Sequence, residues 1–237
     1  MKRTSLLLVM LVFVAFAAPA AAAPQVVDNC GETGTGVEAG ASSVMLDSPR
    51  DLAFDVESVT LSTIFDQTNT TPEGVSIALK TCAPSLPATE LSGTHWLVRW
   101  NTPNNAQGEQ CNATAHLGDS VNQENPQAGV VRKASLYQVC SRPATLPPGA
   151  WEAYFANTSD ITSQTAIDGG TVTWTLPFAS LPAWAKPLLA PGVAMSAPVG
   201  GARDGRRATE LSQGGTVELH LGPADTTEPG TSFTIGS

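Results

Sequence analysis

The residue types that most often carry out hydrolysis are few and scattered in this chain of 237 residues. It has three histidines, His95, His116 and His220, and none of its serines lies in a G-x-S-x-G nucleophile turn. Nothing in the sequence pairs the acidic residues that a glycosidase would need, namely Glu109, Asp119, Glu124, Glu152, Asp160 and Asp168. We therefore expect a protein that is not an enzyme, with an extracellular hydrolase assembled from distant loops as the alternative.

Acidic residues also supply the candidate metal ligands. Asp47, Asp51 and Asp55 crowd the start of the first predicted strand, and carboxylates together with loop oxygens are the ligands that Ca²⁺ prefers. Their spacing matches no EF-hand loop, so ordinary surface carboxylates are the alternative. A zinc site is not expected, because no His-Glu-x-x-His motif is present and no two histidines are close in sequence. We expect no cofactor, and calcium is the one candidate metal.

The tryptophans give the strongest indication of a binding surface. The segment His95-Trp96-Leu97-Val98-Arg99-Trp100 has bulky groups on both of its faces, so one face can be core while the other meets a ligand. A flat, exposed tryptophan beside polar donors can stack on a sugar ring. The sequence thus predicts His95, Trp96, Arg99 and Trp100 as binding residues, with burial of the tryptophans in the core as the alternative.

The elements that must position these residues are strands, because apolar side chains recur at every second position. Residues 171–178 show the pattern most clearly, with Val172, Trp174, Leu176 and Phe178 alternating with threonines. Similar segments are 75–79, 96–100, 151–155 and 216–221, and less regular ones are 56–65, 135–140 and 232–235. We expect Trp151 and Trp174 to lie in the core.

The turn residues, together with the scarcity of segments whose apolar residues have helical spacing, indicate the fold class. Clusters of Gly, Pro and Asn separate the predicted strands, and at most one short helix is expected, near 181–189, where Pro187 limits it. Many short strands divided by such turns are typical of an all-β protein. The sequence predicts an antiparallel β-sandwich of the immunoglobulin or jelly-roll kind.

Residues 1–22 have the features of an export signal. Lys2 and Arg3 precede an apolar run from Leu6 to Ala18, and small residues follow it, which predicts cleavage after Ala22. An uncleaved anchor is the alternative, but no basic stop follows the run. We expect a secreted, extracellular protein with no membrane span after cleavage.

The exported chain divides into two predicted parts. Residues 23–50 are polar and rich in Gly and Ser, and we expect them to wrap the edge of a sheet, tied there by Cys30. Residues 51–237 are expected to form one sandwich domain. Within it, residues 190–215 are rich in Gly, Pro and Ser, which predicts a long loop or a linker to a last hairpin.

The cysteines predict structural disulfides. An even number of them, Cys30, Cys82, Cys111 and Cys140, lies in the exported part, and an oxidising compartment favours two bonds. Four cysteines allow three pairings, and the sequence alone does not choose among them. We favour Cys30–Cys82 together with Cys111–Cys140.

The charge of the chain excludes one class of partner. The formal net charge of −9 becomes about −11 once the two basic residues of the leader are removed. A chain this acidic repels phosphate backbones, so no nucleic acid is expected as a partner. The one basic cluster, Arg203, Arg206 and Arg207, is interleaved with Asp204 and glycine and is expected to be a solvated loop.

Three segments together resemble a known class of module. They are Asp51-Leu52 leading into Val56–Val59, the strand 96–100, and residues 170–177 followed by Leu181-Pro182. This pattern, over residues 50 to 200, is similar to secreted bacterial β-sandwich modules of the DOMON and family-9 carbohydrate-binding type. The resemblance implies a ligand-binding or accessory sandwich from a bacterium, and no haem-ligand or sugar-ligand residue carries over.

The function that these observations favour is a non-catalytic binding module for an extracellular glycan. The alternative is a structural or cell-surface domain that binds a protein partner through a sheet edge or through the face at 95–100.

Overall fold

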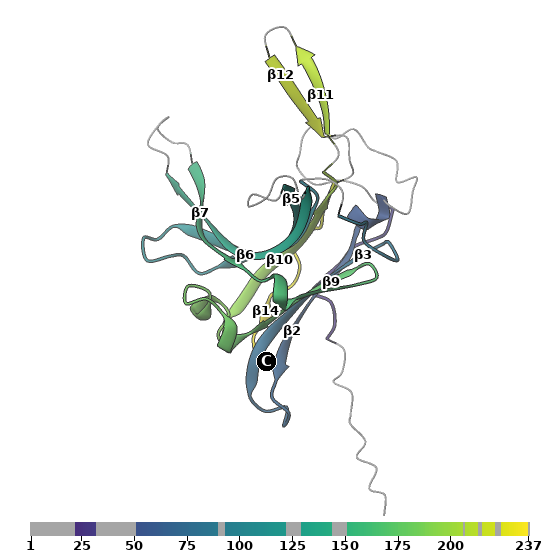
Figure 1. The fold of residues 1–237 in the computed structure, drawn as a ribbon. Coiled ribbons are helices and arrows are strands. Elements are labelled where there is room, and N and C mark those ends of the chain that lie inside the picture. Colours follow the sequence, from purple (N-terminus) through teal and green to yellow (C-terminus); the bar gives the residue numbers. More distant parts are fainter. Residues whose placement is uncertain are drawn as a thin grey trace, which may run out of the picture.

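Alternating apolar residues build two antiparallel sheets that pack face to face in the computed structural model (Figure 1). The structure describes residues 22–31, 51–89, 93–121, 129–143, 151–205, 207–212, 215–220 and 224–236. The predicted all-β sandwich is confirmed. The proposed leader, residues 1–22, lies outside the described residues apart from Ala22.

The first sheet has five strands, in the order β1-β2-β3-β9-β8. Their bounds are β1 (Val26–Val27), β2 (Val56–Phe65), β3 (Pro72–Thr81), β8 (Thr165–Asp168) and β9 (Thr171–Pro177). β1 pairs with β2 at the edge of this sheet, so the described part of the N-terminal segment does lie along a sheet edge.

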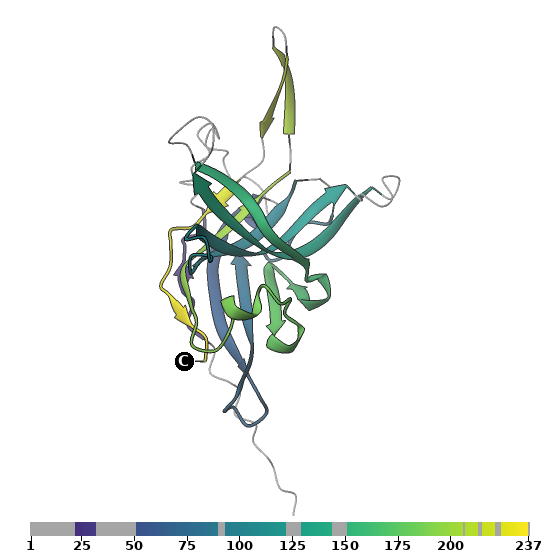
Figure 2. The same ribbon diagram turned by 90° about the vertical axis from the view of Figure 1, so that its left-hand side faces the viewer.

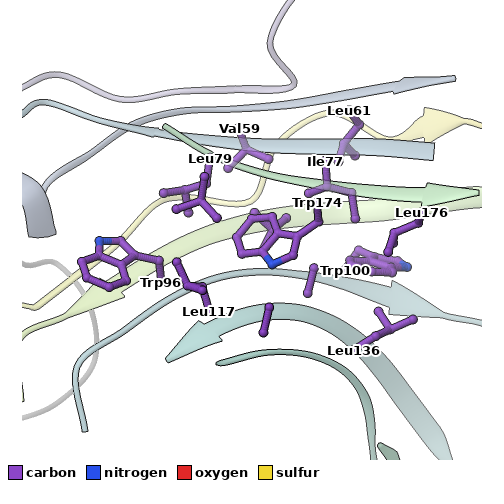
Figure 3. Close-up of a cluster of buried hydrophobic side chains, with 14 of the residues drawn as sticks. Val59, Leu61, Ile77, Leu79, Trp96, Trp100, Leu117, Leu136, Trp174 and Leu176 are labelled. Atoms are coloured by element: carbon purple, nitrogen blue, oxygen red, sulfur yellow. The ribbon is translucent and has the colours of Figure 1, made fainter. Parts of the chain in front are cut away.

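The second sheet has seven strands, in the order β13-β10-β4-β5-β6-β7, with β14 also paired to β10. Their bounds are β4 (His95–Thr102), β5 (Gln110–Val121), β6 (Val130–Pro143), β7 (Trp151–Asp160), β10 (Ala194–Arg203), β13 (Ala224–Thr226) and β14 (Phe233–Thr234). β4 to β7 form an antiparallel meander. These strands arch, so that the side pointing away from the five-stranded sheet is concave (Figures 1 and 3).

The remaining described elements are short. β11 (Arg207–Ser212) and β12 (Gly215–His220) form a two-stranded sheet of their own. Single 3-10 turns are η1 (Asp51–Phe54), η3 (Thr162–Gln164), η4 (Phe178–Ser180) and η5 (Lys186–Leu188). The last of these occupies the segment where the sequence predicts at most one short helix. In the part of the chain that the structure describes, no helix is long and apolar enough to cross a membrane.

The core fills the space between the two sheets (Figure 3). Trp96, Trp100 and Trp174 are its largest fully buried side chains, and Leu61, Ile77 and Leu136 pack with them. The strands over 75–79, 96–100 and 171–177 therefore turn the predicted apolar face inward. The prediction that Trp174 is core is confirmed, whereas the side chain of Trp151 lies outside the described residues.

Both favoured disulfides are present. Cys111 and Cys140 face each other directly across β5 and β6, with their Cα atoms 4.1 Å apart. Cys30 joins Cys82, which follows β3, and thereby holds the segment of β1 against the five-stranded sheet. Two disulfides are typical of proteins that fold in an oxidising compartment.

Two details of the predicted organisation are wrong. The stretch 190–215 is not a long loop, because residues 194–203 form β10, an interior strand between β4 and β13. Small residues let β10 pass close to β2. A Cβ on Gly200, for example, would lie only 2.8 Å from the side chain of Val59. Phe155 does not belong to an inward apolar face either, since 73% of it is exposed.

Candidate functional site

A row of four aromatic rings crosses the concave side of the seven-stranded sheet. The rings belong to His95 on β4, His116 on β5, Tyr137 on β6 and Phe155 on β7. Neighbouring ring centroids are 5.6 Å, 5.9 Å and 5.3 Å apart along this order. The register of the strands explains the row, because it places outward positions of adjacent strands side by side. In this register His116 of β5 lies opposite Ser135 of β6, and Tyr137 of β6 lies opposite Thr114 of β5.

We call this side of β4–β7 the concave face, and it combines the rings with polar groups. Its members are His95, Leu97, Arg99, Thr114, His116, Gly118, Lys133, Ser135, Tyr137, Val139, Phe155, Thr158 and Asp160. They alternate along each strand with the buried residues of the core, such as Trp96, Val98 and Leu136. The same period of two therefore makes the core on one side and this surface on the other.

Phe155 is the most exposed ring of the row. It lies on β7, the edge strand of the sheet, and packs edge-on against Tyr137. Its exposed fraction of 73% is unusual for a phenylalanine, a residue type that is most often buried. An exposed ring on a surface that also carries hydrogen-bonding groups is a feature of ligand-binding faces.

Tyr137 sits in the middle of the row and is partly buried by its neighbours. Burial raises the pKa of its phenol, while a hydrogen bond with the Thr114 side chain and the charge of Arg99 act in the opposite direction. Tyr137 is therefore a neutral hydroxyl at physiological pH, able to donate and accept hydrogen bonds.

A shallow depression of about 230 Å³ lies at the β4 end of the row. His95, His116, Lys133 and Ser135 surround it, and Gly118 contributes no side chain to it. The His116 ring leans over Gly118, where a Cβ would lie 2.4 Å from the imidazole. Glycine at this position thus leaves room for the imidazole ring.

His116 is neutral in this environment. Burial lowers the pKa of its imidazole to about 4, and the nearby His95 adds to the effect. The Nδ1 atom lies 3.5 Å from the Ser135 hydroxyl, at the limit of a hydrogen bond. At neutral pH the ring offers one donor and one acceptor and carries no charge.

An ion pair supports the depression from beneath. Asp119 on β5 and Arg132 on β6 are direct cross-strand neighbours, and both carboxylate oxygens accept from the guanidinium, at 2.7 Å and 2.8 Å. The guanidinium also donates to the Pro87 carbonyl and lies 4.9 Å from the centre of the Trp96 ring. The pair is largely buried, so removal of either partner would leave an uncompensated charge.

The predicted binding residues divide between the two sides of β4. His95 and Arg99 lie on the concave face, but Trp96 and Trp100 are 0% and 1% exposed. Neither tryptophan can stack on a ligand from solvent, because the inward positions of β4 face the five-stranded sheet. The core alternative holds for both.

The predicted calcium ligands are described in part. Asp55 is fully buried and accepts a hydrogen bond from the Gly31 N–H, whereas Asp47 and the side chain of Asp51 lie outside the described residues. Among the residues that are described, no group of three or more potential ligands could hold a metal ion. Calcium stays a prediction.

The candidate acids of a glycosidase that the structure describes lie in different surroundings. Asp119 is held by Arg132, and Glu109 accepts hydrogen bonds from Tyr154 at 2.5 Å and from Asn105 at 2.6 Å. Asp160 and Asp168 are exposed on different sheets. Glu124 and the side chain of Glu152 lie outside the described residues.

Three residues of the row were not predicted as binding residues: His116, Tyr137 and Phe155. Each lies in an ordinary polar or mixed segment, and their proximity depends on the pairing of β5, β6 and β7. The one signal in the sequence is that Tyr137 and Phe155 fall in segments with strand pattern. Comparison with protein-family models, curated proteins and solved structures gave no match to the chain.

Proposed function

We propose that this protein is a secreted, non-catalytic module that binds an extracellular glycan along the concave face of β4–β7. The observation that carries the proposal is the row of rings from His95 to Phe155, with hydrogen-bonding side chains beside it.

The geometry of the row suits an extended oligosaccharide. Adjacent strands lie about 4.8 Å apart, so the rings present apolar surface at regular intervals across the sheet. The C–H faces of sugar rings pack on aromatic side chains, and their hydroxyls need donors and acceptors near by. Ser135 and the Tyr137 hydroxyl provide such groups between the rings, whereas Thr114 is buried and hydrogen-bonds with Tyr137.

Two features favour binding over hydrolysis on this face. The imidazole of His116, with a pKa of about 4, is a weak general base at neutral pH. The Asp119 carboxylate is bound through both oxygens to Arg132, which keeps it in place as a structural anion. Export is supported by the leader pattern of residues 1–22 and by the two disulfides.

The second candidate is a protein partner, and the position of Phe155 favours it. β7 is the edge strand of its sheet and carries this exposed ring. A protein could pair with the edge and cover the phenylalanine, as in strand addition. Such a partner would need the backbone of β7, whereas a glycan would need the side chains of all four strands.

A binding screen with a matched pair of variants tests the proposal. The secreted chain is screened on a glycan array, and any hit is titrated by calorimetry with the wild type, Phe155→Ala and Val27→Ala. Val27 has the same 73% exposed fraction but lies on β1 of the other sheet. We expect Phe155→Ala to weaken binding about tenfold through loss of stacking area, and Val27→Ala to leave it unchanged.

Two results would count against a glycan ligand on this face. One is an array without a hit, together with capture of a protein partner that Phe155→Ala abolishes. The other is glycan binding that Val27→Ala weakens and Phe155→Ala does not.

A further inference from the structure

The concave face carries positive charge in a strongly acidic protein. The chain has 21 acidic and 12 basic residues, yet Arg99 and Lys133 both point to this face and both are exposed. In the part of the chain that the structure describes, neither of them forms an ion pair within 4 Å. Cations that no described carboxylate contacts within 4 Å can attract an anionic ligand.

Lys133 stands at the rim of the depression over Gly118. The hydroxyl of Ser135 and the imidazole rings of His95 and His116 line the same depression. An ammonium group brings three donors and the hydroxyl brings one. A carboxylate or sulfate group placed over Gly118 would therefore meet the Lys133 ammonium and the Ser135 hydroxyl.

Two acidic residues lie near the depression, and one of them is already neutralised. Asp119 lines it, but the bidentate ion pair with Arg132 already compensates that carboxylate. Asp160 lies on β7 opposite Ser135, and its carboxylate accepts a hydrogen bond from the Thr162 N–H. Hydrogen bonds with Thr162 lower the pKa of the Asp160 carboxyl, and the charge of Lys133 adds to this effect. Both side chains are exposed, so salt screens their attraction.

We propose that the depression bounded by Lys133, Ser135, His95 and His116 binds an anionic group, a carboxylate or a sulfate, carried by the glycan. This proposal rests on the proposed function and narrows its ligand to acidic oligosaccharides. The rings of Tyr137 and Phe155 then bind the neighbouring sugars, which need no charge. Lys133 gives the selectivity for charge, and the aromatic row gives the affinity shared by neutral and acidic glycans.

Pairs of ligands in which one member lacks the anionic groups test the proposal. The secreted chain is titrated with an oligogalacturonate and with its methyl ester, and in a second arm with a sulfated dextran oligosaccharide and its unsulfated parent. The variants are Lys133→Gln and, as the matched control, Lys186→Gln, which removes the same charge from the exposed Lys186 of η5. The two arms distinguish a carboxylate from a sulfate.

We expect the wild type to bind the acidic member of at least one pair about tenfold more tightly than the neutral member, the effect of one charge-assisted contact. Lys133→Gln should remove that preference, whereas Lys186→Gln should keep it. The preference should also shrink as salt rises from low to physiological ionic strength.

This proposal would be overturned if the wild type bound the acidic and the neutral ligand of each pair equally and Phe155→Ala weakened both to the same extent. The proposed glycan-binding function would still stand. An acidic preference that survives Lys133→Gln would also overturn the proposal of an anion-binding depression. If the wild type binds none of the four probes and no glycan on the array, the proposed function itself fails.

Discussion

Trp96 connects the core to the concave face. Its ring stacks on Phe54 with centroids 5.4 Å apart, and its Nε1 donates to the Ala53 carbonyl at 2.7 Å. The guanidinium of Arg132 lies over the same ring and holds Asp119 beside the depression. A residue that the sequence suggested as a ligand contact thus acts as the support of the site.

At the residue scale, the sequence could predict which positions of β4 share a side but not which side is core. His95 and Arg99 are correctly outward, as the period of two requires, and the tryptophans lie inward. Aromatic size alone does not decide between core and exposed stacking, because an indole suits both environments. The partners of His95 in the row could not be predicted, since they lie on other strands.

Asp225 makes the stability of the fold depend on pH. Burial raises the pKa of its carboxyl to about 6 from an ordinary value of 3.8, and the nearby Asp28 and Asp55 also raise it. The folded state therefore keeps a proton that the unfolded state releases as pH rises from about 4 to 6. The contribution of the Asp225 carboxyl to the free energy of unfolding is therefore present at low pH and is lost as pH rises from about 4 to 6.

The variant Asp225→Asn tests this dependence. An amide oxygen can still accept the hydrogen bond from the Val56 N–H, and the amide cannot ionise. We expect the variant to gain stability relative to the wild type between pH 4 and 7, by on the order of 2–3 kcal/mol. Urea unfolding at several pH values measures the difference.

Taking the difference between variant and wild type removes a competing contribution from His116. The pKa of that imidazole is about 4 when folded and near 6.5 when unfolded, so its contribution to stability falls as pH decreases through this range. The two groups act in opposite directions over the same interval. A constant difference between Asp225→Asn and the wild type from pH 4 to 7 would show that Asp225 ionises normally in the fold.

At the scale of elements, strands rich in large apolar residues were predictable and strands built of small residues were not. β9 and β3 alternate Val, Leu, Ile and Trp with polar residues, and both were expected. β5 presents Ala113 and Ala115 to the core, and β10 has paired glycines at 200 and 201. Such residues give weak periodicity, although the close approach of β10 to β2 requires them.

The paired glycines of β10 provide a matched test of this close approach. A Cβ on Gly200 would lie 2.8 Å from Val59 and 3.0 Å from Val56, whereas one on Gly201 would lie 3.4 Å from Leu97 on the opposite side. We expect Gly200→Ala to lower the free energy of unfolding by about 1–3 kcal/mol through overpacking, and Gly201→Ala to be nearly neutral. Chemical denaturation measures both, and equal losses would contradict the assigned facing of the strand.

The cysteine pairing was predicted correctly, and the register of the strands explains it. Cys111 and Cys140 are opposite each other in β5 and β6, so closing the bond needs no movement of the backbone. The chain-entropy view assigns about 3–4 kcal/mol to a loop of this size. Cys30–Cys82 fixes an edge segment that is paired through β1, a strand of two residues.

At the scale of the whole molecule, the two sides of the seven-stranded sheet have different roles. Its inner side closes the core against β2, β3 and β9, and its outer side is concave and carries the aromatic row (Figure 2 shows the two sheets from the side). The acidic balance of the chain opposes binding of nucleic acid, yet the cations Arg99 and Lys133 gather on the concave face. The period of two and the turn residues predicted the class of fold, whereas the proposed binding surface depends on register.

Mapping of the ligand position by NMR tests the central claim most directly. The ¹⁵N-labelled chain without residues 1–22 is titrated with the oligosaccharide that binds best, and amide shifts are followed by residue. The concave-face account predicts the largest changes at Thr114, His116, Tyr137 and Phe155, with Thr60 and Ser76 of the five-stranded sheet unchanged. Changes that gather on β2 and β3 and spare β4–β7 would contradict it.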